Sequence, residues 1–524
     1  MQLPKTGSKS CSTAQNQRQK ELRLGSKSGA PKTVAIIGAG LGGLSAAISL
    51  AAAGYQVRIF EKNKRVGGKL NVMKREGFTF DMGPSILTLP EVFRNLFRRA
   101  GKDFDGLVSI RALDTHWRCF FEDHASIDLT ASTDEQKRIF AQLDPELPKR
   151  FERFLAYSRE QYEIVEKPYL RDGVDTFWGM MRGIGLKRLP HVDGLRSMSA
   201  TIDHFFEDQH IRDIFRFFVK YIGSSADKAP GFINLLSWVQ YGFGLWYVDG
   251  GMYAVAEGMT RVLDEMGVEI RCDTEVVSLE REKADCVKGV RLADGMAIDA
   301  DVVVSNMEVI PAYERLLHLD LQALKPLRRF EPTCSGLIVH LGVDRMYEQL
   351  AHHNFLFSTN QTKHFAAVFD KHELPEDPTL YLVAPARTDG AVAPAGHDNL
   401  KILPHIPYLS ERSTFDEQDY MRLKERVLDK CERMGLTDLR KHIVFEHCWT
   451  PYNVRDRYYS NGGSIYGVVT DLRKNYALKA PKRSRICGNL YFVGGSVNPG
   501  GGMPMVVLSG MQTADLVRKE HAHD

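Results

Sequence analysis

One segment near the start of the chain, residues 33–61, constrains the fold more than any other. Thr33–Ile37 is a short β-branched apolar run typical of a buried parallel strand, and Gln56–Phe60 reads as a second strand. Between them stand the glycine turn Gly38–Gly43 and a helix of small residues, Leu44–Ala53. The order strand, G-x-G-x-x-G turn, helix and strand predicts the first unit of a Rossmann-like α/β domain that binds a dinucleotide.

The glycines of this turn and the acid that follows have separate expected roles. Gly38 permits the tight turn, Gly40 lets the backbone approach a pyrophosphate, and Gly43 lets the helix pack closely on the sheet. The helix N-terminus beside Leu41 offers N–H groups and a positive dipole to the phosphates. Glu61 ends the second strand, where its carboxylate can accept hydrogen bonds from ribose hydroxyls.

A second glycine pair follows soon after the ribose acid. Gly67-Gly68-Lys69 comes after Glu61-Lys62, and Gly83-Pro84-Ser85 follows a little later. A second close-approaching backbone segment can cover the dinucleotide, which a simple NAD dehydrogenase does not need. The pattern therefore predicts FAD, with these residues among its contacts.

The remainder of the chain alternates between regular α/β segments and longer excursions. Residues 34–85, 246–306 and 485–520 are predicted to form one discontinuous FAD-binding domain. Residues 86–245 are rich in helical periodicity and are predicted to form a helical, membrane-associating substrate insertion, and 307–484 a substrate-binding domain. The predicted fold is thus α/β, with a Rossmann-like FAD-binding domain interleaved with an α+β substrate-binding domain and a helical insertion.

Charge and cysteine usage exclude several classes of protein. A formal net charge of +3 argues against a dedicated nucleic-acid binder. Eight scattered cysteines without zinc spacing indicate reduced thiols, and no metal site is expected; the pair His352-His353 suggests one only superficially. Residues 1–33 are basic and are predicted to be a flexible leader, the alternative being a plastid transit peptide. Without an apolar run of spanning length, a cytoplasmic protein peripheral to a membrane is expected.

One apolar segment has the composition of a membrane interface. Residues 177–189 combine aromatic residues and methionines with positive charge only. Apolar side chains of this kind can enter lipid while the cations meet anionic head groups. The alternative is a core helix or a loop over a pocket. A second candidate for the membrane face and tunnel mouth is the aromatic-rich interval 231–247, with Phe232, Trp238, Tyr241, Phe243 and Trp246.

Taken in order, the motifs resemble the bacterial-type phytoene desaturase (carotenoid desaturase) family of FAD-dependent amine-oxidase-like flavoproteins. The resemblance extends over about residues 34–519. The matching segments are Gly38–Gly43 with Glu61, Gly67–Lys69, Phe80–Ser85, Trp246–Gly251, Ala300–Asn306, Ala384–Asp389, Asn461–Gly467 and Tyr491–Gly510.

The resemblance implies FAD bound in extended form across three separated segments. Val276 would contact the adenine through its backbone, and the flavin would be lined by Gly494, Gly495, Gly502 and Met503. The chain departs from the general flavoprotein pattern at Ser496, where many amine oxidases have an acid; the desaturases tend to lack it too. It also has Asn498 where many family members have His, which leaves the substrate open.

The reaction that the resemblance implies is removal of hydrogens from a C–C bond of a phytoene-like or hydroxylated polyene, by hydride transfer to flavin, with quinone or oxygen as the final acceptor. Asp249, Arg387 and Glu446 are weak candidates for the proton acceptor. Each has a structural alternative, for example Asp249 as a helix cap and Arg387 paired with Asp389.

Other activities share the same scaffold and stay open at this stage. They are a carotenoid cis–trans isomerase, a retinol-saturase-like reductase and an oxygenase of terminal methyl groups. A soluble amine oxidase is the alternative from another class, and a flavoprotein without enzymatic activity is a further one.

Overall fold

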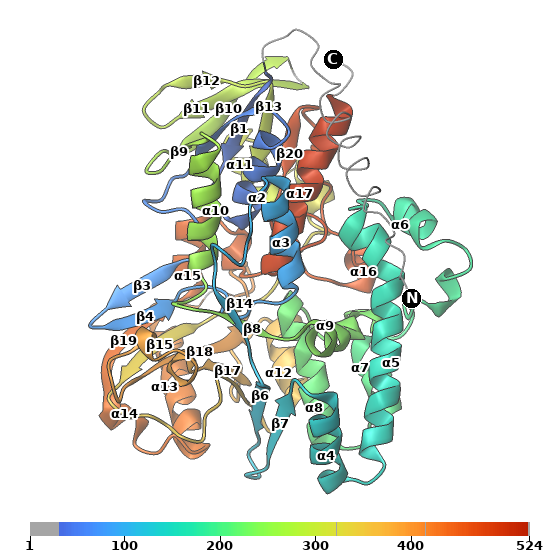
Figure 1. Cartoon of the computed structure of the whole chain (residues 1–524), viewed down its shortest axis with the longest axis vertical. Coiled ribbons are helices and arrows are strands. Elements are labelled where there is room, and N and C mark those ends of the chain that lie inside the picture. The colour runs from blue at the N-terminus through green and yellow to red at the C-terminus, as the bar shows by residue number, and fades with distance from the viewer. Residues whose placement is uncertain (1–30, 284, 321, 414, 522–524) are drawn as a thin grey trace, which may run out of the picture.

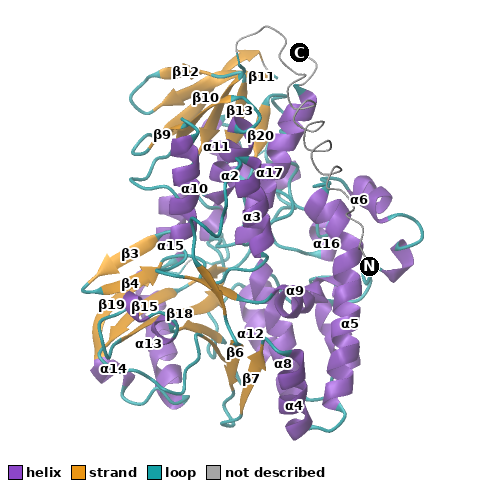
Figure 2. Cartoon of the chain, viewed as in Figure 1, coloured by secondary structure: helices purple, strands orange, loops and turns teal. Residues whose placement is uncertain are grey.

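The computed structural model describes residues 31–283, 285–320, 322–413 and 415–521. Nearly all of the predicted leader, 1–33, therefore lies outside the described residues. Figure 1 places a parallel sheet and its helices at one end of the molecule, and a larger mixed sheet with a group of helices at the other. Figure 2 shows the strands gathered at these two ends and the long helix α5 (Leu147–Val165) along one side.

The parallel sheet is built from segments that are far apart in the sequence. Its order is β20-β13-β1-β2-β9, and every neighbouring pair is parallel. Such a sheet must be covered by helices, because its strands are apolar on both faces. The strands are β1 (Thr33–Ile37), β2 (Gln56–Phe60), β9 (Glu269–Arg271), β13 (Val302–Ser305) and β20 (Leu490–Phe492).

The helix between β1 and β2 packs closely on the last helix of the chain. α2 (Leu41–Ala51) is buried over nearly its whole length, and α17 (Met503–Glu520) lies against it. A Cβ on Gly510 of α17 would lie 2.6 Å from the Gly42 carbonyl oxygen. Glycine at this position therefore allows the approach of the two helices. The same core is covered by α3 (Pro90–Arg99) and α10 (Ala254–Glu265).

A smaller antiparallel sheet, β10-β11-β12, extends this end of the molecule. Its strands are β10 (Val276–Lys283), β11 (Cys286–Leu292) and β12 (Ala297–Asp299), and α11 (Val309–Leu316) packs beside it. Two hairpin-like pairs lie nearer the middle of the molecule. They are β3 (Val72–Arg75) with β4 (Phe78–Asp81), and β5 (Ile110–Ala112) with β8 (Trp246–Val248).

The larger sheet has eight strands in the order β19-β15-β18-β17-β16-β6-β7, with β14 paired to β18. All its pairs are antiparallel except β16 with β6. One face is covered by α13 (Glu417–Arg433). The strands are β6 (Thr115–Phe120), β7 (Ser126–Thr130), β14 (Ser335–Gly336), β15 (Ile338–Val343), β16 (His353–Leu356), β17 (Leu380–Val383), β18 (Asp398–Ile406) and β19 (Ile443–Trp449).

Strands β6 and β7 correct one sequence expectation, because they lie inside the interval 86–245 that was predicted to be helical. β7, and β6 from Trp117 onward, alternate buried and more exposed residues, as a half-covered strand does. They join the sheet otherwise built from residues after 334. The sequence signal for these strands was an alternation of apolar and polar residues, which the many aromatic residues of this interval obscured.

The helices of the same interval pack on the other face of this sheet through an aromatic core. Trp117 of β6 stacks on Phe355 of β16 with ring centroids 4.1 Å apart. The aromatic stretch 200–222 forms two short helices and a 3₁₀ turn, because Asp208 caps a new helix by accepting from the Ile211 N–H. The helices are α4 (Thr133–Leu143), α5, α6 (Phe177–Ile184), α7 (Met198–Phe205), α8 (Gln209–Phe217) and α9 (Leu235–Phe243).

Candidate functional site

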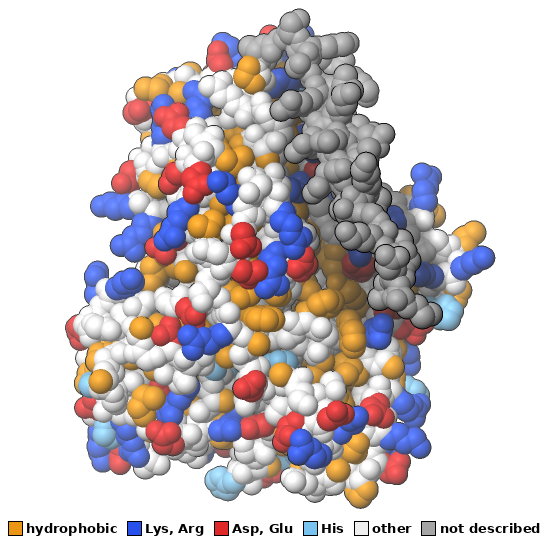
Figure 3. All heavy atoms as spheres, viewed as in Figure 1, with side chains coloured by type: hydrophobic (Ala, Val, Ile, Leu, Met, Phe, Trp, Pro, Cys, Tyr) orange, Lys and Arg blue, Asp and Glu red, His pale blue; other side chains and the backbone are white. Residues whose placement is uncertain are grey.

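A cavity of about 860 Å³ runs between the two ends of the molecule. It begins at the carboxyl ends of β1, β2 and β13, where ligands bind in doubly wound sheets. It continues past strands β15, β17 and β18 of the larger sheet to helices α6 and α9. Figure 3 shows hydrophobic side chains gathered in the hollow between the region of α3 and that of α5.

The cavity brings together almost all of the predicted cofactor residues. Those that line it are Gly38, Gly40, Leu41, Glu61, Lys62, Gly67, Gly68, Lys69, Gly83, Pro84, Ser85, Val276, Gly494, Gly495, Gly502 and Met503. Gly43 is the exception, because it faces the sheet: its Cβ would lie 2.2 Å from the Gly38 carbonyl oxygen. That the lining residues contact FAD stays a prediction, which the geometry below supports.

Glu61 is held in place by backbone and side-chain donors at the end of β2. Its Oε2 accepts from the Ala39 N–H at 2.8 Å. Its Oε1 accepts from the N–H and the Nδ2 of Asn63 at 2.8 and 2.7 Å. Only 4% of the side chain is exposed. A carboxylate fixed in this way ties the glycine turn to the second strand and faces the cavity with its remaining lone pairs.

The glycine segments form a cradle that side chains would fill. A Cβ on Gly40 would lie 2.4 Å from Nδ2 of Asn306, and one on Gly83 would lie 1.8 Å from the Lys69 carbonyl oxygen. Gly68 packs on the Cα of Gly40, so the second glycine pair covers the first. Backbone alone can therefore approach a bulky ligand here, which fits an extended dinucleotide.

Two helix N-termini point their N–H groups toward this cradle. α2 begins after Gly40 and α17 after Gly502, and neither residue has a side chain to cap its helix. Both residues line the cavity. An uncapped N-terminus can accept an anion or a polar oxygen. The first suits a pyrophosphate, and the second suits a carbonyl of a flavin ring that becomes negative on reduction.

Lys69 fastens the covering loop to two other segments. Its Nζ lies 3.0 Å from Oε1 of Glu308 and donates to the Ser464 carbonyl oxygen at 2.9 Å. Lys62 donates to the Asp456 carbonyl oxygen and lies 3.3 Å from the ring centre of Tyr459. Both lysines therefore connect the FAD-binding region to residues after 450.

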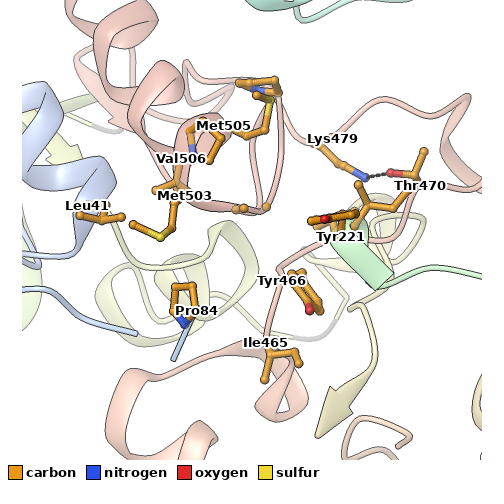
Figure 4. Close-up of a pocket in the computed structure, with 18 of the residues that line it drawn as sticks. Leu41, Pro84, Tyr221, Ile465, Tyr466, Thr470, Lys479, Met503, Met505 and Val506 are labelled. Atoms are coloured by element: carbon orange, nitrogen blue, oxygen red, sulfur yellow. Dashed lines mark hydrogen bonds between the residues drawn. The ribbon is translucent and has the colours of Figure 1, made fainter. Parts of the chain in front are cut away.

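The part of the cavity expected to hold the flavin is drawn in Figure 4. Met503, Pro84 and Leu41 lie on one side, and Tyr221 and Tyr466 on the other. Lys479 donates to Oγ1 of Thr470 at 2.7 Å beside Tyr221. Burial lowers the pKa of Lys479 to about 7.

The two departures from family patterns have structural roles of their own. Ser496 accepts from the Val309 N–H at 3.1 Å, so it fixes the start of α11. Asn498 accepts from the Lys479 N–H at 2.9 Å and donates to Asp175 at 3.2 Å. Neither Ser496 nor Asn498 is among the residues that line the cavity.

A buried lysine, Lys401, closes the cavity where the FAD-binding region meets the larger sheet. Nζ of Lys401 donates to the Gly83 carbonyl oxygen and, at 3.0 Å, to Oγ of Ser85. Burial lowers the pKa of Lys401 to about 8, while the charge of Asp81 opposes this shift. Burial raises the pKa of Asp81 to about 6. Oδ1 of Asp81 itself accepts from the Met252 N–H at 2.9 Å, so Asp81 and Lys401 interact only through their charges.

Beyond Lys401 the cavity is largely apolar and reaches the segment 177–189. Phe177, Met180, Met181, Ile184 and Leu189 all line it. On the outside of the same segment Trp178 is 79% and Leu186 88% exposed, and Leu195 nearby is 98% exposed. Arg182, Lys187 and Arg188 are exposed beside them. In the part of the chain that the structure describes, no helix combines the length and apolarity needed to cross a membrane.

Most of the second candidate segment for the tunnel mouth, residues 231–247, lies away from the cavity lining. Of the five aromatic residues named for 231–247, Phe232 alone lines the cavity. Tyr241 packs against Phe151 inside the helical core, and Trp246 packs in the core below the parallel sheet. Trp238 lies under Arg159. Spacing along the chain could not separate these environments.

The three candidate proton acceptors lie away from the cavity lining and in ion pairs. Asp249 accepts from Ser109 and Arg111 at 2.6 Å each, rather than capping α10. Glu446 pairs with Lys424 at 2.6 Å. We therefore assign both to structural ion pairs.

Arg387 also lies outside the cavity lining, and its partners differ from the expected ones. It pairs with Glu348 at 2.9 Å and with the buried Asp398 at 3.5 Å, not with Asp389. Asp389 instead accepts from the Gly250 N–H and from Tyr247. The expected Arg387–Asp389 pair is therefore wrong, because the chain turns at 385–392 and separates the two side chains.

The histidine pair has protein partners. Nδ1 of His352 lies 2.7 Å from Oγ1 of Thr388, and Nδ1 of His353 lies 3.1 Å from the hydroxyl of Tyr381. The centres of their rings are 4.4 Å apart in an edge-on contact. Within the described ranges no three His, Cys, Asp or Glu side chains gather in a way that could hold a metal ion.

Several residues of the site were not singled out from the sequence. Asn306, Lys220, Lys401 and Lys479 line the cavity, and Asp81 lies behind it. A usable signal was present: each lysine stands in an otherwise apolar stretch, as in Phe217-Phe218-Val219-Lys220. A charged residue at a position that should be buried is more often functional than one on a polar face.

Comparison with known proteins gives a consistent assignment. Residues 41–518 match the family model described as flavin-containing amine oxidoreductase. The chain is 53% identical to a 4,4′-diapolycopene oxygenase from Methylomonas sp. over 92% of this chain and 97% of that protein. It is 46% identical to a 4,4′-diaponeurosporene oxygenase from Staphylococcus haemolyticus, over 93% and 97% of the two chains.

Solved structures with the same fold share little sequence with this chain. An oxidoreductase from Methanosarcina mazei superposes with a TM-score of 0.63 at 16% identity, over 92% of this chain and 100% of that one. Putrescine oxidase bound to putrescine superposes with a TM-score of 0.62 at 15% identity, over 93% and 99%. These likenesses establish the fold.

Proposed function

This chain belongs to the flavin-containing amine oxidoreductase family and is an FAD-dependent oxidoreductase, and from that premise we propose that it oxidises a linear carotenoid polyene. The observation that carries the proposal is the single cavity that joins the predicted FAD cradle to a long apolar compartment. A polyene needs such a compartment, because it has no polar group to bind along its length.

Within this class, we favour oxygenation of a terminal methyl group over desaturation. The relatives with 53% and 46% identity are named for oxygenation of diapolycopene and diaponeurosporene. Desaturation, the reaction first implied by the motifs, stays a prediction that the same experiment tests. A soluble amine oxidase is disfavoured, because the walls that would face a small cationic substrate are largely apolar.

The chain's own residues would mainly bind, orient and exclude water. FAD, when bound, would supply the two-electron acceptor for the terminal carbon, and dioxygen would supply the oxygen atom, so that overall R–CH₃ and O₂ give R–CHO and H₂O. The cradle of Gly38–Gly43 and Glu61 would hold its adenosine half, and Pro84, Tyr466 and Met503 would enclose the ring. Lys401 would fix the loop that carries Pro84, since it donates to Gly83 and Ser85 on either side of it.

The substrate would enter from a membrane at the segment 177–189. The outer face of this segment carries exposed apolar side chains and three exposed cations, and its inner face lines the cavity. Figure 1 shows α6 projecting from the side of the molecule beside α5. An apolar surface flanked by cations suits an anionic lipid surface.

Expression of the protein in cells that accumulate a linear hydrocarbon polyene tests the reaction, and the mass of the product is the readout. We expect products that have gained one oxygen and lost two hydrogens per oxidised end. Loss of two hydrogens without oxygen would replace oxygenation by desaturation. An unchanged pigment, with FAD still bound to the purified protein, would refute both.

Co-sedimentation with anionic liposomes tests the membrane face separately. Trp178→Ser and Leu186→Ser should each reduce the bound fraction, because both side chains are exposed at the mouth. Leu143→Ser is the matched control, since Leu143 is also exposed but lies at the end of α4. Equal binding of all three variants would refute the assignment of this face.

A further inference from the structure

One lysine inside the cavity has no evident reason to be there. Lys220 stands in the 3₁₀ turn Phe218–Ile222, is 3% exposed and lines the cavity. An amine in such a place is unfavourable unless it is paired, because burial removes its hydration. Burial and the nearby charge of Lys401 lower the pKa of Lys220 well below its ordinary value.

Aromatic rings surround this amine. Nζ lies 3.9 Å from the ring centre of Tyr381 and 4.2 Å from that of Trp117. Tyr221 and Phe355 complete the enclosure at 4.8 and 5.1 Å. In the described part of the chain no oxygen accepts a hydrogen bond from Nζ of Lys220. Its N–H groups therefore lack an acceptor.

A second donor in the same wall is also unpartnered. Oε1 of Gln240 accepts from Nε1 of Trp117 at 2.7 Å and from the hydroxyl of Tyr221 at 3.3 Å. These two contacts fix the amide, and its Nε2 has no partner among the described residues. Gln240 and Lys220 line the same cavity and are joined through Trp117 and Tyr221.

We propose that Lys220 and Gln240 form a binding site for an oxygen atom at the end of the polyene, in a hydroxyl or aldehyde group. This inference rests on the proposed function and deepens it by naming the substrate class. Two N–H donors without acceptors select an oxygen acceptor. The nearby walls, Ile338 and Leu403 among them, are apolar and suit the hydrocarbon part of the same molecule.

The position of the site indicates which end of the polyene it holds. Tyr221, whose ring centre lies 4.8 Å from Nζ of Lys220, also lies in the part of the cavity expected to hold the flavin (Figure 4). The held oxygen therefore belongs to the end that is being oxidised. A partly oxidised polyene would bind more tightly than the hydrocarbon and would be retained for its next oxidation.

Equilibrium binding to the FAD-loaded protein tests this site without turnover. The probes are a linear polyene with a hydroxyl group at each end and the hydrocarbon with the same carbon skeleton. Anaerobic quenching of protein fluorescence reports both affinities. We expect the diol to bind the wild type about tenfold more tightly, as one or two buried hydrogen bonds would provide.

Lys220→Met should abolish this preference while leaving the affinity for the hydrocarbon within about twofold, because Met preserves the length of the side chain. Lys220→Gln, which keeps an N–H donor, should restore part of it. Leu403→Met changes the same wall at similar volume and should keep the full preference.

A tenfold preference that persists in Lys220→Met would overturn the inference, as would equal affinities of the two probes for the wild type. Failure of the proposed function has a different signature. In that case the wild type binds neither polyene, although it retains FAD. If Lys220→Met does not fold, Gln240→Leu provides the second test and should reduce the preference at least threefold.

Discussion

Replacing Glu61 by Gln isolates the contribution of one carboxylate to the dinucleotide site. The side chain keeps its volume but exchanges one acceptor oxygen for an NH₂ group. Asn63 offers two donors to Oε1, so the amide oxygen of Gln should take that side. The NH₂ group then faces the Ala39 N–H, which loses its acceptor at 2.8 Å.

The magnitude follows from these contacts. Ala39 is fully buried, so its unsatisfied N–H costs about 1–3 kcal/mol of folding free energy. A ribose hydroxyl that loses a charged acceptor loses about 1.5–3 kcal/mol of binding free energy. The Kd for FAD should therefore rise roughly ten- to a hundredfold. The unfolding temperature of the apoprotein should also fall by a few degrees.

Fluorescence titration of FAD into deflavinated protein measures the first effect, and thermal unfolding of the apoprotein measures the second. Glu446→Gln is the matched control, because Glu446 pairs with Lys424 outside the cavity lining and should leave the Kd unchanged. If Glu61→Gln binds FAD within twofold of the wild type, Glu61 does not hold the ribose. A lower unfolding temperature without a change in the Kd for FAD would then report only the lost hydrogen bond from the Ala39 N–H.

Three further variants test the packing and the charges around the cavity. Gly43→Ala should lower both FAD retention on gel filtration and the unfolding temperature, since its Cβ would lie 2.2 Å from the Gly38 carbonyl oxygen. Asp81→Asn should cost more in urea unfolding in the wild-type background than in Lys401→Met, because the charge of Asp81 opposes the desolvation of the buried Lys401 amine. The pKa of Lys479 is about 7 in the folded protein against an ordinary 10.5, so between pH 7 and pH 9 the unfolded chain binds more protons than the folded one. Over this interval the free energy of unfolding of the wild type should therefore rise by about 2 kcal/mol relative to that of Lys479→Met.

Each of these variants has an outcome that would contradict its reasoning. Gly390→Ala is the control for the glycine, because its Cβ meets no atom within 4 Å; an equal loss in both variants would refute close packing as the cause. Additive losses for Asp81 and Lys401 would mean that the two side chains do not interact. Parallel pH profiles for the wild type and Lys479→Met would show that Lys479 keeps an ordinary pKa in the folded protein.

The dinucleotide half of the site could be predicted because its requirements are local. A glycine turn between a strand and a helix must occur within a few residues, and an acid at the end of the next strand lies beside it by topology alone. Thr33–Ile37 and Gln56–Phe60 appear in the structure with the predicted bounds. The terminal strand and helix were also recognisable, because Gly494 and Gly502 bracket a turn of the same kind.

The substrate half could not be predicted in the same way, because its contacts join distant segments. β6 pairs with β16 across more than two hundred residues, and this pairing turned part of a predicted helical interval into sheet. The candidate proton acceptors show the converse. Asp249 and Arg387 stand in recognisable motifs, yet their partners Arg111 and Glu348 come from other segments.

The sequence by itself determined the cofactor class, the order of the α/β segments and the apolar, basic composition of residues 177–189. These depend on periodicity, glycine positions and composition, which act over a few residues. Only the tertiary structure decided that Lys220 and Gln240 face one cavity, and that Lys401 contacts Gly83 and Ser85. Burial and electrostatics depend on which surfaces meet after folding, and a linear pattern does not contain that information.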